Sequence, residues 1–335
     1  MENQKRRLDG IDLFKFILAF FVIAIHAYKT ENMASFIFVD GICRVAVPFY
    51  FIVSGYFCFR KKNIEGYLKS IITLYLVWTV IYLPVIINGM ITDNPKGHSA
   101  AYVIIRWIIL QFSLSGSYFH LWYINATFWG VLIVYILLKV GIKPKGVLII
   151  SAAVYLAGLL GQSYHGLIAG TPVERIFQLY CKVFSSTRNG LFIGFPFIAM
   201  GAYISEKHIC MPVKKSLPLF FIGIALLIFE VLFTRQNTAP ADYNSYIFLP
   251  LCAFALFMLS LNIESATPGK YRPLRDISVI TFFVHMYVLM GINSVSSAVL
   301  NPPVRYLTVS VVSLAVSLAI YRLSKRFKPL RYLYA

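Results

Sequence analysis

Two ionisable side chains, Lys15 and His26, lie eleven residues apart in the first hydrophobic stretch of the chain. In an α-helix that spacing is about three full turns, so both side chains project from nearly the same face, roughly 16 Å apart along the axis. Ionisable groups inside membrane helices are costly and usually face an interior that serves function. The alternative is that Lys15 snorkels to the headgroups and His26 sits at the opposite interface.

A second histidine and two arginines fit a shared interior. His285 lies about ten residues into a later hydrophobic stretch, roughly 15 Å deep, while Arg44 and Arg188 open two others. A neutral imidazole in such a bundle suits a general base, and nearby cations would attract an anionic substrate or stabilise an oxyanion. Each residue alone is equally explained by packing, as a hydrogen-bonded histidine or an interfacial arginine.

The stretch after Arg44 runs through Pro48 to Ser54, Gly55 and Tyr56. Proline and glycine within a membrane helix predict a kink and a close approach of a neighbouring helix. Plain helix packing explains the same pattern.

Further polar groups occur at membrane depth. Trp122 fits an interfacial aromatic belt, and Asn125 needs a polar partner once it is buried. Glu230 is a lone carboxylate in an apolar stretch, and Asp12 precedes Lys15 by three residues, which favours a local ion pair.

Composition places the chain among membrane proteins. Of its 335 residues, 59% are hydrophobic and 13% are charged, more apolar surface than a soluble protein of this length can bury. Most of the cations behind the net charge of +18 fall in short loops on alternate sides of the hydrophobic stretches. This bias predicts that both termini are cytoplasmic and makes a nucleic-acid partner unnecessary.

The hydrophobic stretches predict one all-α domain over residues 1–335, a polytopic bundle of about ten transmembrane helices in the lipid bilayer. Segment 99–113 is short and contains Arg106, so we expect an interfacial or re-entrant helix there. The predicted spans are 11–28, 43–59, 67–88, 120–139, 146–161, 189–205, 216–234, 244–262, 275–297 and 304–322.

The five cysteines are scattered without metal-ligand spacing, so we expect no metal site and no disulfide framework. A single bridge between Cys43 and Cys181 stays open. The basic residues Lys5, Arg6 and Arg7 precede the first stretch as in a signal peptide. No small-residue cleavage site follows, so we expect a retained first span.

Five short motifs, in the first, second, fourth, sixth and ninth predicted spans, resemble those of the acyltransferase-3 family and occur in the same order. The members of this family are integral membrane proteins that acylate hydroxyls of sugars and other cell-envelope acceptors. The resemblance covers most of the chain. Lys15 stands where that family usually has arginine, and a point cation does not make the bidentate phosphate contact of arginine. The matching residues are Lys15, His26, Arg44, Pro48, Phe49, Tyr50, Phe51, Ser54, Gly55, Tyr56, His120, Leu121, Trp122, Tyr123, Arg188, Asn189, Phe192, Gly194, Pro196, Phe197 and His285.

The resemblance implies a bacterial plasma-membrane enzyme that takes acyl groups, acetyl by expectation, from cytoplasmic acyl-coenzyme A. The head of the donor would lie near Lys15, and the thioester would reach His26, which acts as general base or covalent acyl carrier. The acceptor would be a cell-envelope glycan or lipid-linked hydroxyl, with an extracytoplasmic transferase as a partner. Candidate donor- or substrate-binding residues are Lys15, Arg44, Ser54, Tyr56, Trp122, Asn125, Arg188 and His285.

Two other readings compete. The same stretches resemble the membrane half of the vancomycin-resistance serine racemases, which implies transport or binding of a small amino acid such as serine. Those proteins continue into a cofactor-bearing domain, whereas this chain stops about a dozen residues after its last predicted span, which favours the enzyme. A non-catalytic structural protein would make the spacing of Lys15 and His26 an accident.

Overall fold

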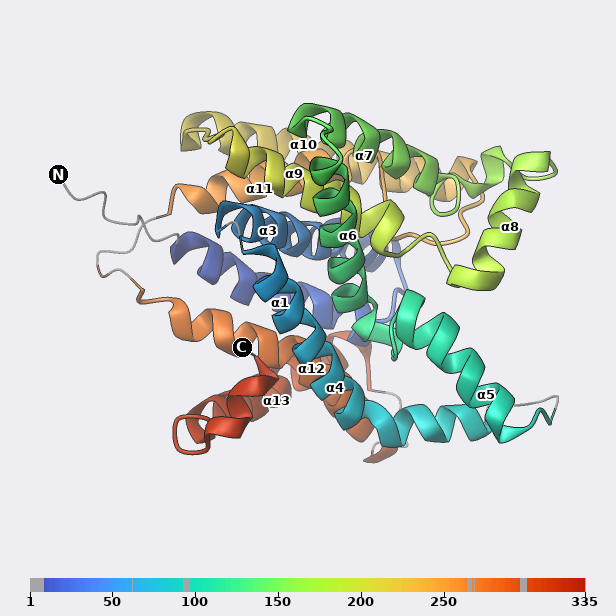
Figure 1. The fold of residues 1–335 in the computed structure, drawn as a ribbon, viewed down its shortest axis with the longest axis vertical. Coiled ribbons are helices and arrows are strands. Elements are labelled where there is room, and N and C mark those ends of the chain that lie inside the picture. The colour runs from blue at the N-terminus through green and yellow to red at the C-terminus, as the bar shows by residue number, and fades with distance from the viewer. Residues whose placement is uncertain are drawn as a thin grey trace. The chain divides into compact units, whose positions relative to one another are not determined.

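The computed structural model describes residues 9–61, 63–92, 97–263, 267, 269–295 and 300–334. All regular secondary structure within these ranges is helical (Figure 1), which confirms the all-α prediction. The basic residues Lys5, Arg6 and Arg7 before the first stretch, and the loop cation Lys62, lie outside the described residues.

Seven helical runs in the described part of the chain are long and apolar enough to cross a membrane. Each overlaps one of the predicted spans, so the polytopic membrane fold is confirmed. They are α1 (Asp9–Ala27), the run Met33–Lys61, α4 (Ile64–Thr92), the run Phe119–Lys139 that ends in α6 (Trp122–Lys139), α10 (Val213–Asn237), α12 (Arg272–Val295) and α13 (Pro302–Leu323).

The other three predicted spans fall on shorter apolar helices, so their crossing of the bilayer stays a prediction. Segment 99–113 falls on a fourth, and its interfacial or re-entrant placement is likewise a prediction. Residues 296 and 297 of the predicted span 275–297 lie outside the described residues. The shorter helices are α5 (Ala100–Arg106) with η3 (Trp107–Ser115), α7 (Pro144–Leu159), η6 (Gly190–Gly194) with α9 (Phe195–Glu206), and α11 (Leu249–Leu261).

The second span starts ten residues earlier than the predicted 43–59 and is irregular in its first half. Pro48 has no N–H to donate to the turn before it, and its ring crowds that turn, so a regular α-helix is disfavoured there. The predicted distortion thus takes the form of π and 3₁₀ turns. The run consists of α2 (Met33–Phe36), η1 (Ile37–Gly41), η2 (Ile42–Val45) and α3 (Ala46–Lys61).

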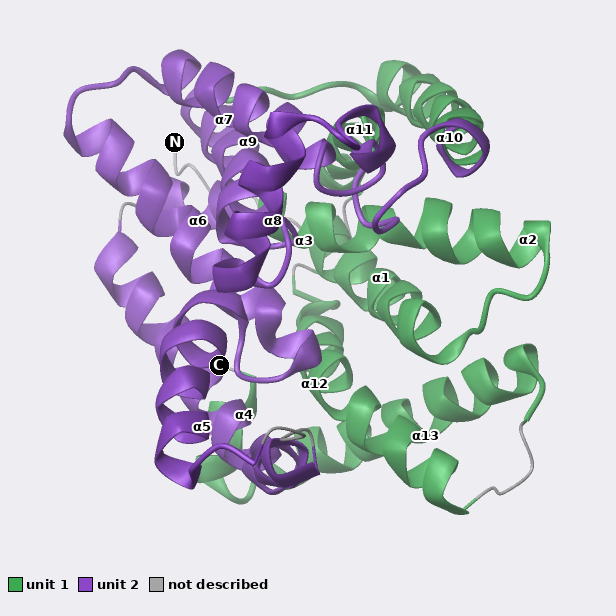
Figure 2. Ribbon diagram, turned by 90° about the vertical axis from the view of Figure 1, so that its right-hand side faces the viewer, with its two compact units in different colours: residues 1–53, 208–233, 246–335 green, residues 54–207, 234–245 purple. Residues whose placement is uncertain are grey.

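The chain forms two compact units, coloured separately in Figure 2. Unit 1 contains residues 1–53, 208–233 and 246–335, and unit 2 contains residues 54–207 and 234–245. The division passes through α3 and α10, so each unit is built from segments distant in sequence. The single domain over residues 1–335 stays a prediction.

In unit 1, α1 packs along α12, and α12 packs along α13. Ile23 and Ala27 of α1 meet Leu289 of α12 and Val309 of α13 in a buried cluster. At the other end of α1, a Cβ on Gly10 would lie 2.2 Å from the backbone oxygen of Ser260, so only glycine permits this approach.

The lone carboxylate of Glu230 has a structural partner in unit 1. It accepts hydrogen bonds from the backbone N–H groups of Ile247 (2.5 Å) and Phe248 (2.9 Å), directly before α11. The first N–H groups of a helix have no partner within the helix, and a carboxylate there also suits the helix dipole. Glu230 is 3% exposed and therefore caps a buried helix end.

In unit 2, α6 packs against η6 and α9, and α7 packs against α9. A Cβ on Gly55 would lie 2.2 Å from the backbone oxygen of Ile198 in α9, which confirms the close helix approach predicted at Gly55. A Cβ on Gly194 would similarly lie 2.5 Å from the oxygen of Ala126 in α6. These glycines let three helices come into backbone contact.

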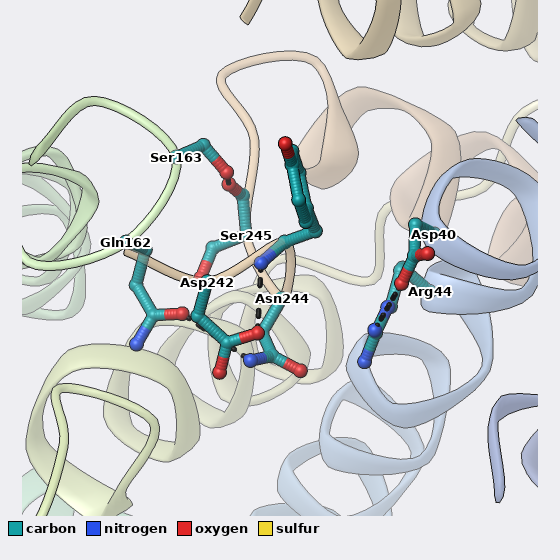
Figure 3. Close-up of polar contacts among 8 residues, drawn as sticks. Asp40, Arg44, Gln162, Ser163, Asp242, Asn244 and Ser245 are labelled. Atoms are coloured by element: carbon teal, nitrogen blue, oxygen red, sulfur yellow. Dashed lines mark hydrogen bonds and ion pairs between the residues drawn. The ribbon is translucent and has the colours of Figure 1, made fainter. Parts of the chain in front are cut away.

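A buried polar network in unit 2 ties two connecting segments together (Figure 3). The Nε2 group of Gln162 donates to Thr187 Oγ1 at 2.9 Å, and its backbone oxygen accepts from the N–H of Ala241 at 3.0 Å. Next to it, the hydroxyl of Ser163 donates to the backbone oxygen of Ser245. The network fixes the segment after α7 against the segment after α10.

Candidate active site

Lys15 and His26 both lie in α1, which is an unbroken α-helix from Asp9 to Ala27. The regular helix keeps the two side chains on one face, three turns apart. The hydroxyl of Tyr50 in α3 donates to the backbone oxygen of Lys15 at 2.6 Å. This bond fixes the start of α1 to the buried face of the second span.

His26 and His285 lie together in unit 1. Their rings stack, with centroids 5.2 Å apart and planes inclined by 28°. His285 is fully buried, whereas His26, in the last turn of α1, is partly exposed. A partly open imidazole backed by a buried one is an arrangement that can exchange a proton with a bound hydroxyl.

The tautomer of neutral His285 follows from its neighbour. Its Nδ1 lies 2.6 Å from the backbone oxygen of Phe282, and a carbonyl can only accept, so Nδ1 carries the proton. In the neutral ring Nε2 is then the acceptor. Two stacked imidazolium ions at this separation would repel each other.

The packing of α1 on α12 explains why these two histidines meet. Ile23 and Ala27 flank His26 on α1, and Leu289 lies one turn beyond His285 on α12. These apolar residues belong to one buried cluster, so the face of α1 that carries His26 is held against α12. The histidine contact is thus positioned by hydrophobic packing on both helices.

Lys15, toward the other end of α1, is close to both positively and negatively charged side chains. The charged groups that act on it are Arg275, Asp12 and Asp276. Arg275 donates to Asp276 from Nε and Nη2 at 2.9 and 2.7 Å. Lys15 therefore interacts electrostatically with Asp12 of its own helix and with Arg275 and Asp276 of α12. This charged cluster is wider than the local pair of Asp12 and Lys15 that the sequence predicted.

Arg44 forms an ion pair with Asp40 one turn earlier, with Nη2 of the arginine 2.5 Å from Oδ1 of the aspartate (Figure 3). The side chains are 13% and 14% exposed. The cation predicted at this rim is therefore largely offset by a carboxylate. The sequence reasoning missed Asp40, although its spacing of four residues from Arg44 is the signal of a helical ion pair.

The remaining predicted site residues lie in unit 2. The guanidinium of Arg188 lies over the rings of Phe119 and Trp122, 5.2 and 5.3 Å from their centroids. Two cation–π contacts hold this cation against the start of α6. Two predicted residues, Arg188 and Trp122, are thus brought together, with Phe119 as an additional partner.

Asn189, next to Arg188, fixes the local backbone by hydrogen bonds. The Oδ1 atom of Asn189 accepts from the N–H groups of Leu191 and Phe192 and so caps η6. Its Nδ2 group donates to the hydroxyl of Tyr180 at 2.7 Å. Burial raises the pKa of Tyr180 to about 12, so this hydroxyl keeps its proton at neutral pH.

Asn125 has a structural role in unit 2. Its buried Nδ2 group donates to the backbone oxygens of Phe112 and Ser113 at 3.2 and 3.1 Å, which satisfies the predicted need for a polar partner. The side chain of Ser54 lies close to the side chains of Tyr67 and Tyr123. All of these contacts lie within the helix bundle of this unit.

Tyr56 and His120 are held by aromatic and polar neighbours in unit 2. The hydroxyl of Tyr56 accepts from Arg60 at 3.0 Å, and the guanidinium lies over the tyrosine ring. His120 is 1% exposed and meets the stacked rings of Tyr82 and Tyr118 edge-on, with centroids 4.7 and 5.8 Å away.

All five cysteines are free thiols in the structure, and Cys43 and Cys181 belong to different units. Among the described residues, no three His, Cys, Asp or Glu side chains come together in a group that could hold a metal ion.

Comparisons with known proteins identify the family of the chain. The acyltransferase domain family matches residues 8–322. Similar curated proteins are an amino-acid racemase of Enterococcus faecalis, 28% identical over 345 residues, and a serine/alanine racemase of Enterococcus gallinarum, 28% identical over 323 residues. These alignments cover 97% and 91% of this chain, but 47% and 45% of the relatives.

The chain thus spans about half the length of the curated relatives it matches. No solved structure matches it significantly. The family match extends over nearly all of the helices described above, including those that carry Lys15, His26 and His285. The chain belongs to the acyltransferase-3 domain family.

Proposed function

We propose that this multi-pass membrane protein transfers an acyl group, acetyl in the first instance, from cytoplasmic acyl-coenzyme A to a hydroxyl of a cell-envelope carbohydrate or a similar acceptor. The observation that carries the proposal is the stacked pair of His26 and His285, with Lys15 three turns away on the same face of α1. The family supports an acyl-transfer activity.

His26 is the proposed reacting group because it is the more open member of the pair. As general base it takes the proton of the acceptor hydroxyl while the oxygen attacks the thioester carbonyl. The carbon–sulfur bond then breaks, and the leaving thiolate takes up a proton. As acyl carrier, the imidazole instead attacks the thioester itself and later yields the acyl group to the hydroxyl.

Lys15 is the proposed contact for the anionic head of the donor. Its neighbour Arg275 supplies a second positive charge, while Asp12 and Asp276 limit the excess charge of the cluster. The roughly 16 Å along α1 from Lys15 to His26 is comparable to the reach of a pantetheine arm. Phosphates bound at Lys15 would therefore put the thioester beside the histidine pair.

The other predicted residues are proposed to bind or position substrate in their own units. Arg44, paired with Asp40, and His285 belong to unit 1. Arg188 with Trp122 offers a cation and an aromatic face of the kind that binds sugars or anions. Ser54, Tyr56 and Asn125 complete the proposed set in unit 2.

The proposed setting is the bacterial plasma membrane, with both termini in the cytoplasm. This orientation follows from the bias of cations in the loops. The acceptor is then a cell-envelope glycan or a lipid-linked precursor on the far side. An extracytoplasmic transferase is a proposed partner that completes the transfer.

A second candidate function is transport or binding of a small amino acid such as serine, without acyl transfer. It is supported by the names of the curated relatives, which are amino-acid and serine/alanine racemases. Under this function the histidine pair would bind the carboxylate or ammonium of the amino acid. Uptake of labelled serine into proteoliposomes, with no consumption of acyl-coenzyme A, would favour it.

The test is acyl-coenzyme A turnover by the purified protein in detergent, followed by release of the coenzyme A thiol. We expect turnover by the wild type and its loss in His26→Ala. His98→Ala is the matched control, since His98 is an exposed histidine beside Tyr102 in unit 2. Full transfer by folded His26→Ala protein would refute the assignment.

A further inference from the structure

The helix α8 (Pro172–Phe184) presents an exposed apolar stripe. Val173, Ile176, Leu179 and Val183 are 40%, 66%, 61% and 41% exposed. Their spacing of three or four residues puts them on one side of the helix. Singly exposed aliphatic side chains are common, but a contiguous row of four indicates a contact surface.

The face of α8 that adjoins this stripe is fixed to unit 2 by aromatic packing and hydrogen bonds. The ring of Tyr180 stacks on Phe184 at 4.4 Å and meets Phe192 edge-on at 5.3 Å. The hydroxyl of Ser115 donates to the backbone oxygen of Phe184 at 3.1 Å. The exposed stripe therefore belongs to a well-anchored helix.

The charges of α8 are arranged along the edge of this stripe. At about 100° per residue, Arg175 and Lys182 lie between the polar side of the helix, which carries Gln178, and the exposed aliphatic row. Both cations are exposed. Long basic side chains beside an apolar stripe are typical of helices that lie in a membrane surface, where they reach lipid phosphates.

The position of α8 in the chain is between two of the predicted spans, 146–161 and 189–205. It lies in the connection between α7 and α9, two apolar helices of the same unit that pack against each other. Figure 1 shows α8 running across the direction of α7 and α9 rather than along it. With four charged or amide side chains in thirteen residues, α8 is itself unsuited to cross the bilayer.

We propose that α8 is an in-plane membrane helix. Its aliphatic row, Val173, Ile176, Leu179 and Val183, inserts among the acyl chains at the membrane surface, and Arg175 and Lys182 contact phospholipid phosphates. A second copy of the chain or another protein would not require the row of cations beside the apolar stripe. This inference is independent of the proposed acyl transfer.

Spin labels on α8 in the full-length protein test this proposal. The protein is reconstituted in nanodiscs of phosphatidylethanolamine and phosphatidylglycerol, after replacing the partly exposed Cys181 and exposed Cys210 by serine. Single labels go on Ile176→Cys and Leu179→Cys, with Gln178→Cys as the matched control between them. Power saturation then compares collisions with oxygen, which partitions into lipid, and with a water-soluble nickel chelate.

We expect the ratio of oxygen to nickel accessibility at positions 176 and 179 to exceed that at position 178 several-fold. Equal nickel accessibility at all three positions would put the stripe in water and overturn the proposal. Low accessibility to both reagents at 176 and 179 would mean that protein covers the stripe, which also overturns it. Monodisperse elution and unchanged thermal unfolding of each labelled variant establish that the fold is intact.

Discussion

Replacing His285 with phenylalanine tests whether the imidazole itself, rather than a ring of similar size, is needed beside His26. The phenyl ring keeps a planar group in the fully buried site, where the imidazole stacks at 5.2 Å. It removes both ring nitrogens and therefore any exchange of a proton within the pair. A direct comparison of stability and turnover separates these effects.

The loss of stability should be small. The substitution removes the hydrogen bond from Nδ1 to the backbone oxygen of Phe282 in the preceding turn of the same helix. Such a bond contributes about 0.5–1.5 kcal/mol net, and the added apolar burial offsets part of it. We therefore expect the free energy of unfolding to fall by about 1 kcal/mol or less.

The loss of activity should be much larger. Proton transfer by a positioned side chain contributes about 10²–10⁴-fold to a rate. Since His26 remains, we expect His285→Phe to lower kcat by about 10²-fold, or about 2.7 kcal/mol of barrier. The KM for acetyl-coenzyme A should change little, because Lys15 lies roughly 16 Å along α1 from the pair.

The assay is release of the coenzyme A thiol by purified variants, with His98→Phe as the control for replacing a histidine elsewhere. Thermal unfolding in the same detergent establishes that each variant is folded. If folded His285→Phe keeps kcat within twofold of the wild type, the pair does not exchange a proton in the reaction. The reasoning from the stacked geometry would then be refuted.

Three further predictions concern stability and are measured by thermal or denaturant unfolding in detergent. Glu230→Ala should cost about 2–5 kcal/mol, because two backbone N–H groups at a buried helix end lose their acceptor. Gly55→Ala should lower the free energy of unfolding by about 1–3 kcal/mol, because its Cβ would overlap a backbone oxygen at 2.2 Å. Gly291→Ala is the control, because a Cβ there would meet open space, and it should be neutral or stabilising by up to about 1 kcal/mol. A double-mutant cycle of Arg44→Gln and Asp40→Asn should give a coupling energy of about 1–3 kcal/mol, since both side chains are largely buried.

Each of the three stability predictions would be contradicted by a specific result. Wild-type stability of Glu230→Ala would mean that water reaches the start of α11 and replaces the carboxylate. Equal effects of alanine at Gly55 and Gly291 would exclude the backbone contact of α3 with α9. Additive single substitutions at Arg44 and Asp40 would mean that the two side chains do not interact in the folded protein.

Hydrophobic length was sufficient to predict most of the helices. A run of apolar residues such as that of α1 or α13 leaves its backbone no partner in lipid except its own turns, so helix positions follow from composition. The register of Lys15 with His26 followed in the same way, because the spacing of side chains within one helix is fixed. Local sequence thus decided both features.

Tertiary contacts were beyond this reasoning. That His26 stacks on His285 depends on how α1 lies along α12, which is decided by Ile23, Ala27 and Leu289 together. The sequence around a single histidine in a span does not indicate which residue of another helix it contacts.

Polar pairing across long sequence distances was missed for the same reason. Glu230 looked like a membrane-level charge, but it satisfies two N–H groups seventeen and eighteen residues later. The contacts of Gln162 with Thr187 and Ala241 join segments that share no local pattern. The pair of Asp40 and Arg44 is different, since its helical spacing was visible in the sequence.

The most direct measurement of the central claim is acyl-coenzyme A turnover by purified protein, with the wild type beside His26→Ala, Lys15→Ala and the control His98→Ala. We expect coenzyme A release by the wild type and the control. His26→Ala should lose kcat, and Lys15→Ala should have a raised KM for the donor. Turnover that is indifferent to both residues, or no turnover by folded wild type with any common donor while labelled serine is taken up, would contradict the central claim.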